Sequence, residues 1–100
     1  MKLVWAKESE DDIQRLFDFL YEKNPSAAAK AIELILEKSE LLVEFPDIGF
    51  RMNDDSGRRE LIIPFGASAY VIRYYLLKEY VVIVRVWHNR ENRELGPEND

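Results

Sequence analysis

Three runs rich in β-branched and aromatic side chains lie between residues 58 and 88, and they limit the fold more than any other part of the chain. They cover residues 58–64, 69–77 and 80–88. Such side chains fit the pleated surface of a strand. Pro64 and Gly66 separate the first two runs, and Lys78-Glu79 separates the last two, so turns are expected at both places. The pattern predicts a three-stranded antiparallel meander.

A two-residue turn at Lys78-Glu79 would place Leu77 opposite Tyr80 and fix the register of the last two strands. Alternation then predicts one face with Val71, Arg73, Tyr75, Leu77, Tyr80, Val82, Val84, Val86 and His88. The other face would carry Tyr70, Ile72, Tyr74, Leu76, Val81, Ile83, Arg85 and Trp87. Both faces are mostly apolar, so each needs a cover. Helices can cover one face, and the lack of an obvious second cover suggests a protein partner.

The first half of the chain is predicted to form an edge strand at residues 2–5 and two helices. Ser9 with Asp12 has the spacing of a helix N-cap and its third residue, which predicts a helix starting at Ser9. Apolar side chains then recur at helical spacing, at Ile13, Leu16, Phe17, Leu20 and Tyr21. Asn24-Pro25 predicts the end of this helix and the start of a second, which should run to about Glu44. The short link predicts an antiparallel hairpin, followed by a long loop at residues 46–57.

Composition fits one small domain, predicted at residues 1–93, with a polar tail at 94–100. The net charge of −5 argues against indiscriminate binding of nucleic acid. Residues 1–57 carry 7 basic and 13 acidic side chains, whereas residues 58–100 carry 7 and 6. An anionic ligand would therefore bind the second half, unless the acidic helices only keep the protein soluble. Without cysteine, a signal peptide or a long apolar run, the chain is expected to be cytoplasmic and to avoid membranes.

Few residues suit catalysis. One histidine and no cysteine cannot build an ordinary metal site, and the scattered glycines form no phosphate loop, so neither metal nor cofactor is expected. His88 follows the last strand near several arginines, where it could act as an acid or base beside a bound phosphodiester. Alternatively, it caps the strand end and the arginines pair with carboxylates. Arg73 and Arg85, both mid-strand, need either an internal partner such as Asp12 or a partner chain.

Short motifs follow one another in a recognisable order over nearly the whole chain, from about Leu3 to Arg93. They are Trp5-Ala6, Asp12-Ile13, Asn24-Pro25-Ser26-Ala27-Ala28, Pro46-x-x-Gly49, Arg59-Glu60-Leu61, Tyr70-Val71-Ile72 with Tyr74, and Val82-Ile83-Val84-Arg85-Val86-Trp87-His88 ending near Arg90. Together they resemble the RelE/ParE superfamily of bacterial toxins from toxin–antitoxin (plasmid stabilisation) modules, most closely its ParE branch. The resemblance implies an α+β fold of order β-α-α-β-β-β, with a helical hairpin packed on a small, mainly antiparallel sheet.

The resemblance also implies growth arrest and a protein partner. A cognate antitoxin, encoded beside the toxin, would fold its disordered C-terminal segment over the toxin. Arg73, Tyr75, Arg85 and Trp87 are the candidates for contact with this antitoxin. Both a homodimer and a toxin–antitoxin hetero-oligomer are compatible with the sequence.

Two targets follow from the two branches of the superfamily. ParE-type toxins inhibit DNA gyrase, whereas RelE-type toxins cleave mRNA in the ribosomal A site. A nuclease of this kind would use Arg59, His88 and Arg90 as its catalytic residues. The acidic charge, the absence of basic residues at positions 65–69, and Leu95 near the place of a terminal tyrosine favour the gyrase inhibitor without catalysis. A degenerate toxin that only binds an antitoxin is a third hypothesis.

Overall fold

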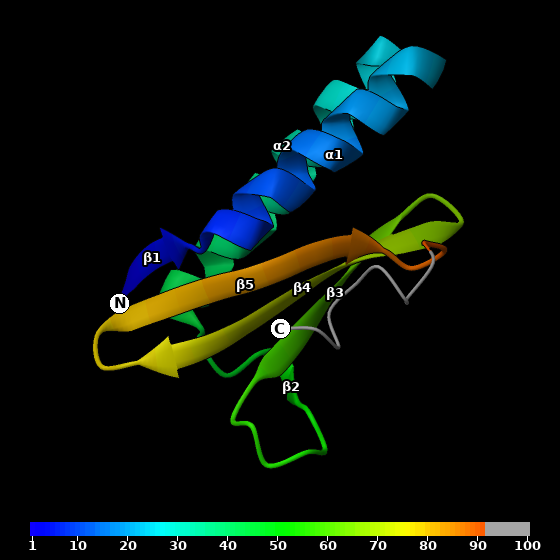
Figure 1. The fold of residues 1–100 in the computed structure, drawn as a ribbon. Coiled ribbons are helices and arrows are strands. Elements are labelled where there is room, and N and C mark those ends of the chain that lie inside the picture. The colour runs from blue at the N-terminus through cyan, green and yellow to red at the C-terminus, as the bar shows by residue number, and fades with distance from the viewer. Residues whose placement is uncertain (92–100) are drawn as a thin grey trace.

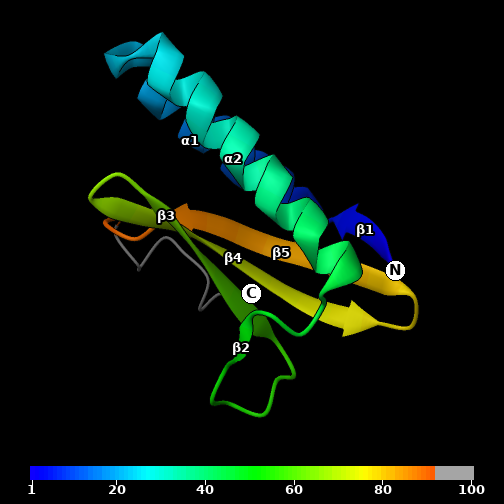
Figure 2. The ribbon, with the colours of Figure 1, turned by 180° about the vertical axis from the view of Figure 1, so that it is seen from behind.

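The computed structural model describes residues 1–91 and shows a helical hairpin packed on one face of a five-stranded sheet (Figures 1 and 2). The elements are β1 (Lys2–Trp5), α1 (Lys7–Lys23), α2 (Pro25–Glu44), β2 (Phe50–Arg51), β3 (Arg59–Phe65), β4 (Ser68–Leu77) and β5 (Tyr80–His88). The strand order is β1-β5-β4-β3-β2, and only β1 runs parallel to its neighbour. The expected α+β class is confirmed. The predicted tail at 94–100, with Leu95, lies outside the described residues.

The chain forms the two helices largely where the sequence predicts them. The side chain of Asn24 accepts a hydrogen bond from the N–H of Ala27, so Asn24 caps α2 as expected, and Pro25 occupies its first turn. The predicted start of α1 at Ser9 is wrong, because the N-cap is Ala6. Ser9 is buried within the first turn and donates its hydroxyl to the Ala6 carbonyl at 2.6 Å.

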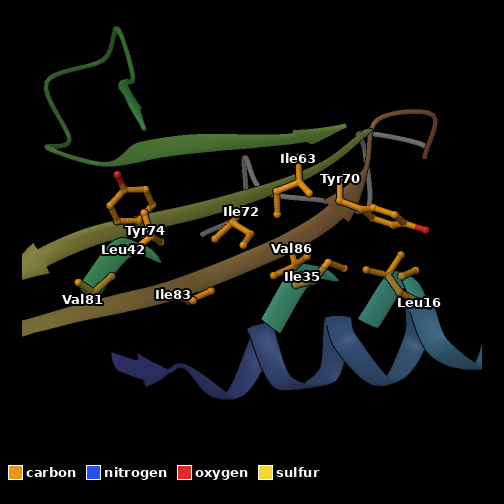
Figure 3. Close-up of a cluster of buried hydrophobic side chains, with 11 residues drawn as sticks. Leu16, Ile35, Leu42, Ile63, Tyr70, Ile72, Tyr74, Val81, Ile83 and Val86 are labelled. Carbon is orange, nitrogen blue, oxygen red and sulfur yellow. The ribbon is translucent and has the colours of Figure 1, made fainter. Parts of the chain in front are cut away.

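The core lies between the hairpin and the sheet (Figure 3). Its buried apolar side chains are Leu16, Ala31, Ile35, Leu42, Ile63, Tyr70, Ile72, Tyr74, Val81, Ile83 and Val86. The helices contribute one stripe each, and β4 and β5 contribute alternate residues, as an amphipathic layer against a sheet requires. On the face away from the helices, Val71 and Trp87 are also buried, while Ile62 and Leu77 remain exposed at the margins.

A β-bulge in β5 changes the predicted faces of the sheet. The turn at Lys78-Glu79 is confirmed, with Leu77 opposite Tyr80, and the register holds as far as Tyr74 opposite Ile83. Beyond that point Arg73 lies opposite Arg85, so β5 has one extra residue. Every later side chain of β5 is therefore on the other face from the one predicted. Val86 and His88 lie with Ile72 and Tyr70 on the helix side, and Trp87 lies with Val71 on the opposite side.

The loop between α2 and β3 is less irregular than the sequence predicted. It contains the two-residue strand β2, which pairs with Arg59 and Glu60 at the edge of the sheet. The N–H of Met52 donates to the carbonyl of Arg58, so even-numbered residues of β3 direct their backbone groups to this edge. Pro64 falls on the same side, where its missing N–H leaves no donor for another strand.

Tyr74 holds this loop to the sheet. Its buried hydroxyl donates to the Pro46 carbonyl at 2.7 Å and accepts the N–H of Gly49 at 2.9 Å. Burial raises the pKa of Tyr74, although the Gly49 N–H and the nearby Arg59 act in the opposite direction. Burial also raises the pKa of Tyr70, and the charge of Glu91 adds to this effect.

These two tyrosines should make the fold sensitive to alkali. The unfolded chain releases their protons near pH ~10, whereas the folded chain holds them to a higher pH. Their contribution to stability is therefore complete below about pH 10 and is lost as the pH rises through the raised values. We expect the melting temperature to fall from about pH 9.5 upward, and to fall less steeply in Tyr74→Phe than in Tyr21→Phe, which changes an exposed ring. Equal slopes in the two variants would contradict this account.

Candidate functional site

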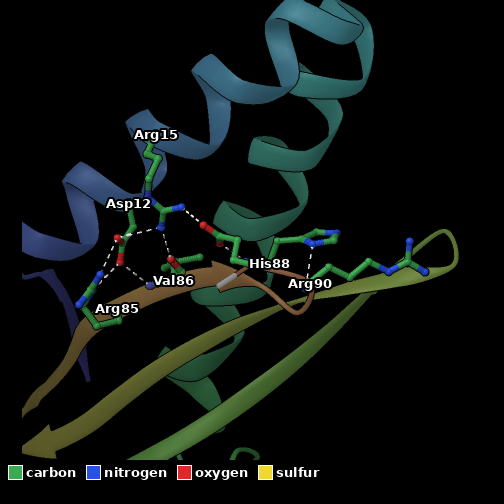
Figure 4. Close-up of polar contacts among 7 residues, drawn as sticks. Asp12, Arg15, Arg85, Val86, His88 and Arg90 are labelled. Carbon is green, nitrogen blue, oxygen red and sulfur yellow. Dashed lines mark hydrogen bonds and ion pairs between the residues drawn. The ribbon is translucent and has the colours of Figure 1, made fainter. Parts of the chain in front are cut away.

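Asp12 of α1 is the centre of a buried polar network at the edge of β5 (Figure 4). The residue is 3% exposed. Its carboxylate accepts Nε of Arg85 at 2.8 Å, Nη2 of Arg85 at 3.1 Å and Nη2 of Arg15 at 3.0 Å. It also accepts the backbone N–H of Val86 at 2.8 Å. The internal partner expected for Arg85 is thus confirmed.

This network bonds to the backbone of β5 beyond the end of β1. The last backbone contact of the first strand joins the Ala6 N–H to the Ile83 carbonyl at 2.9 Å. Further along β5, the Val86 N–H bonds to Asp12 and the Val86 carbonyl accepts Nη2 of Arg15 at 3.3 Å. Side chains of α1 therefore occupy backbone groups that a longer β1 would have paired.

Arg73 is also paired within the chain, but with a strand residue. It is 5% exposed, and its Nε and Nη2 donate to Oε2 of Glu60 at 3.0 and 2.6 Å. Its guanidinium lies 5.2 Å from the centre of the Trp87 ring. The expected helix carboxylate is therefore wrong for Arg73, because Glu60 lies directly opposite it on β3. Of the four candidates for antitoxin contact, Arg73 and Trp87 are buried, whereas Arg85 and Tyr75 are partly exposed.

His88 is held at the end of β5 by contacts to ring and backbone. Its ring packs edge-on against Tyr70 at 5.2 Å, and its Nδ1 accepts the N–H of Arg90 at 3.1 Å. The neutral imidazole therefore carries its proton on Nε2. The His88 N–H donates to Oε2 of Glu91 at 2.6 Å, and the other oxygen of Glu91 pairs with Arg15. These contacts match the structural alternative, in which His88 caps the strand end.

The three candidate catalytic residues are not gathered in one place. His88 and Arg90 are adjacent, but Arg59 lies opposite Tyr74, four residues along β4 from the partner of His88. At the rise of an extended strand this is about 13 Å. Arg59 also donates Nη1 to the carbonyls of Gly49 and Asp47, at 2.7 and 3.2 Å. Its side chain therefore fixes the loop, as Tyr74 does.

A groove of about 430 Å³ opens between α1 and the end of the sheet. It is lined by Arg15, Leu16, Phe19, Leu20, Tyr70, His88, Arg90 and Glu91. The sequence did not predict it, because the groove depends on the bulge that turns His88 toward the helices. The sequence held one signal, because Phe19 is a large apolar residue outside the apolar stripe of its helix. In the structure its side chain is 59% exposed.

Residues 1–91 contain no cluster of His, Cys, Asp and Glu that could hold a metal ion. Within the same range, neither helix is long and apolar enough to cross a membrane.

Residues 3–93 match the model of the ParE toxin of the type II toxin–antitoxin system parDE. This chain belongs to the ParE toxin family. It is therefore a toxin of a type II toxin–antitoxin system, which implies a cognate antitoxin. The match confirms the membership that the sequence motifs indicated.

Curated relatives of this ParE-family toxin come from Caulobacter vibrioides. It is 40% identical to "Toxin RelE3" over 82 residues, which cover 82% of this chain and 87% of the relative. It is 43% identical to "Toxin RelE1", over 82% of this chain and 86% of the relative. A solved structure described as the chromosomal ParDE TA system from P. aeruginosa matches with a TM-score of 0.72 and 22% identity, over 88% of this chain and 95% of that one. This last likeness supports the fold.

Proposed function

We propose that this toxin arrests growth by binding and inhibiting DNA gyrase, without catalysis of its own, and that its antitoxin neutralises it. The observation that carries the proposal is the separation of the candidate catalytic residues. Arg59 is bonded to the carbonyls of Gly49 and Asp47, about 13 Å along the sheet from the level of His88. Cleavage of RNA needs acid, base and phosphate-binding groups that converge on one phosphodiester. The described residues offer no such convergence around His88.

A ribosome-dependent endoribonuclease of RelE type is the second candidate. Two relatives are named RelE toxins, which favours this alternative. The bond from the Arg90 N–H uses Nδ1 of His88, so Nε2 remains available as a proton donor. His88 and Arg90 both line the groove. These two residues could contact a phosphate without Arg59.

Two assays run in parallel separate the candidates. Purified toxin should block gyrase supercoiling or trap cleavage complexes, and should leave mRNA on programmed ribosomes intact. The variant His88→Ala/Arg90→Ala should inhibit gyrase as strongly as the parent does. Cut mRNA with unaffected gyrase, lost in the same variant, would establish the endoribonuclease. Soluble folded protein without effect in either assay or on growth would indicate a degenerate toxin.

For antitoxin contact, Arg73, Tyr75, Arg85 and Trp87 remain the candidates on and around the sheet. Tyr75 is the most direct test, because Arg73 and Arg85 already form ion pairs within the chain and their loss would disturb the fold. Substitution of Tyr75 by alanine should weaken the complex if the antitoxin crosses this face.

A further inference from the structure

The turn after β5 is closed by a side chain that can change its charge. Nδ1 of His88 accepts the N–H of Arg90 at 3.1 Å, and the His88 carbonyl accepts the N–H of Glu91 at 3.0 Å. The ring therefore acts as an Asn or Asp side chain does in an Asx turn, where it accepts the N–H two residues further on. Unlike an amide, an imidazole exchanges this acceptor for a donor within the physiological range of pH.

Glu91 connects the same turn to the helical hairpin (Figure 4). One of its carboxylate oxygens accepts the His88 N–H at 2.6 Å, and the other pairs with Arg15 of α1. The turn is therefore fixed at two points, by the His88 ring within it and by Glu91 on the side of the helix. His88, Arg90, Glu91 and Arg15 all line the groove, so this turn forms part of its polar rim.

The charged groups around the ring act in both directions. Arg90 in the turn and Arg15 on α1 disfavour another positive charge, whereas the carboxylate of Glu91 favours it. From β4 the ring faces Tyr70, in edge-on contact at 5.2 Å. Burial, and then the charge of Glu91, raise the pKa of Tyr70, so this phenol is neutral when the imidazole titrates. Glu91 is the only carboxylate among the described residues that line the groove, so it is the acceptor available there to a charged ring.

We propose that His88 is a pH-sensitive latch for the end of β5. With the ring neutral, Nδ1 accepts the Arg90 N–H and the turn is closed. When Nδ1 takes up a proton from water it becomes a donor, and the Arg90 N–H loses its acceptor. The charged ring then turns to the carboxylate of Glu91 and shares it with Arg15. Acid therefore opens the turn and rearranges the rim of the groove, and a ligand that uses this rim should bind in a pH-dependent manner.

The test is a titration of the full, ¹⁵N-labelled chain between about pH 5 and pH 8, the range in which an imidazole changes its charge, followed by NMR. His88 is the only histidine of the sequence, so its ring signals are unambiguous. The neutral ring should carry its proton on Nε2. The protection of the Arg90 N–H is its intrinsic exchange rate with water divided by the observed rate. It should fall about fivefold as the ring becomes charged, as expected for the loss of one ordinary hydrogen bond, and with the same midpoint as the ring signals.

Ser56 provides a control in the same sample. Its N–H bonds to Oδ1 of Asp54 at 3.0 Å, which is also a bond across two residues. Hydrogen bonds from Ser56 hold the pKa of Asp54 below its ordinary value, so this acceptor stays charged and the protection of Ser56 should be constant over the titration.

Two variants separate the acceptor from its titration. His88→Asn supplies an oxygen that can accept the Arg90 N–H and does not titrate, so the protection should be the same at both ends of the range. His88→Ala supplies no acceptor, so the Arg90 N–H should be unprotected throughout.

Three results would overturn the proposal. A neutral ring with its proton on Nδ1 would exclude the acceptor itself. Constant protection of Arg90 while the ring titrates would show that the turn closes without the imidazole. An equal loss of protection at Ser56, or at Arg90 in His88→Asn, would show that acid loosens the loops in general. None of these readouts involves gyrase, mRNA or the antitoxin, so the latch can fail while the proposed function stands, and the reverse.

Discussion

Replacement of Asp12 by alanine should lower the free energy of unfolding by about 3–5 kcal/mol, the usual cost of removing one partner of a buried ion pair. Arg85 would lose both of its contacts to this carboxylate, and the Val86 N–H would lose its acceptor. A buried donor without an acceptor carries its full desolvation cost. Urea unfolding, followed by circular dichroism, measures the change.

The neighbouring Asp11 provides the control. It differs from Asp12 by one position on α1, and its side chain is 64% exposed and bonded to Lys7. Exposed pairs of this kind contribute little, so Asp11→Ala should leave the unfolding midpoint almost unchanged. Asp12→Asn should fall between the two, because the amide oxygen can still accept one hydrogen bond while the charge is lost. Similar midpoints for Asp11→Ala and Asp12→Ala would show that the network stabilises nothing.

Alanine at Gly49 should also destabilise strongly, by about 1–3 kcal/mol, as overpacking of a buried site usually does. A Cβ at this position would lie 2.6 Å from the Tyr74 hydroxyl and 2.9 Å from the Glu60 carbonyl oxygen. Neither neighbour can move easily, because Tyr74 is fully buried and Glu60 belongs to the β2–β3 pairing. The loop must therefore shift, which would disturb the bonds from Arg59 to Gly49 and Asp47.

A double variant identifies the cause. Tyr74→Phe alone should cost stability because the Gly49 N–H loses its acceptor. In Gly49→Ala/Tyr74→Phe the contact with the hydroxyl is gone, while those with Cε1 of the ring at 2.7 Å and with the Glu60 carbonyl oxygen remain. The double variant should therefore lose less stability than the sum of the two single variants, because the hydroxyl contact and its hydrogen bond are each lost only once. If the losses in free energy of unfolding of the two single variants simply add up in the double variant, the alanine at position 49 does not act through the Tyr74 hydroxyl.

The sequence could predict elements whose signals are local. Asn24-Pro25 defines the helical joint, because a capping side chain and a proline in the first turn act within four residues. Lys78-Glu79 defines the hairpin for the same reason. The bulge in β5 has no such signal: the run from Tyr80 to His88 is almost continuously apolar, so no break in a pattern marks the extra residue, which appears only when both strands are paired. The faces of Val86, His88 and Trp87 were wrong for this reason alone.

The candidate site was predictable only in part. Asp12 was a reasonable partner for Arg85, since an arginine within an apolar strand needs a carboxylate and α1 carries several. Glu60 was missed as the partner of Arg73, because the register between β3 and β4 depends on the turn at Gly66 rather than on either strand. The groove required the helix positions, the bulge and the strand ends together, and no single segment encodes that combination.

The stretches of β5 and β3 that the short strands β1 and β2 leave unpaired have a consequence for behaviour at high concentration. Sheets with free rims recruit one another through backbone pairing, and this is a common start of aggregation. Here the peptide groups of Val86, on the unpaired stretch of β5, bond to Asp12 and Arg15, and Pro64, on the unpaired stretch of β3, has no N–H to donate. Copies of this toxin should therefore resist fibre formation even when released from their antitoxin. Any association between them should depend on side chains, and a single surface substitution should be able to abolish it.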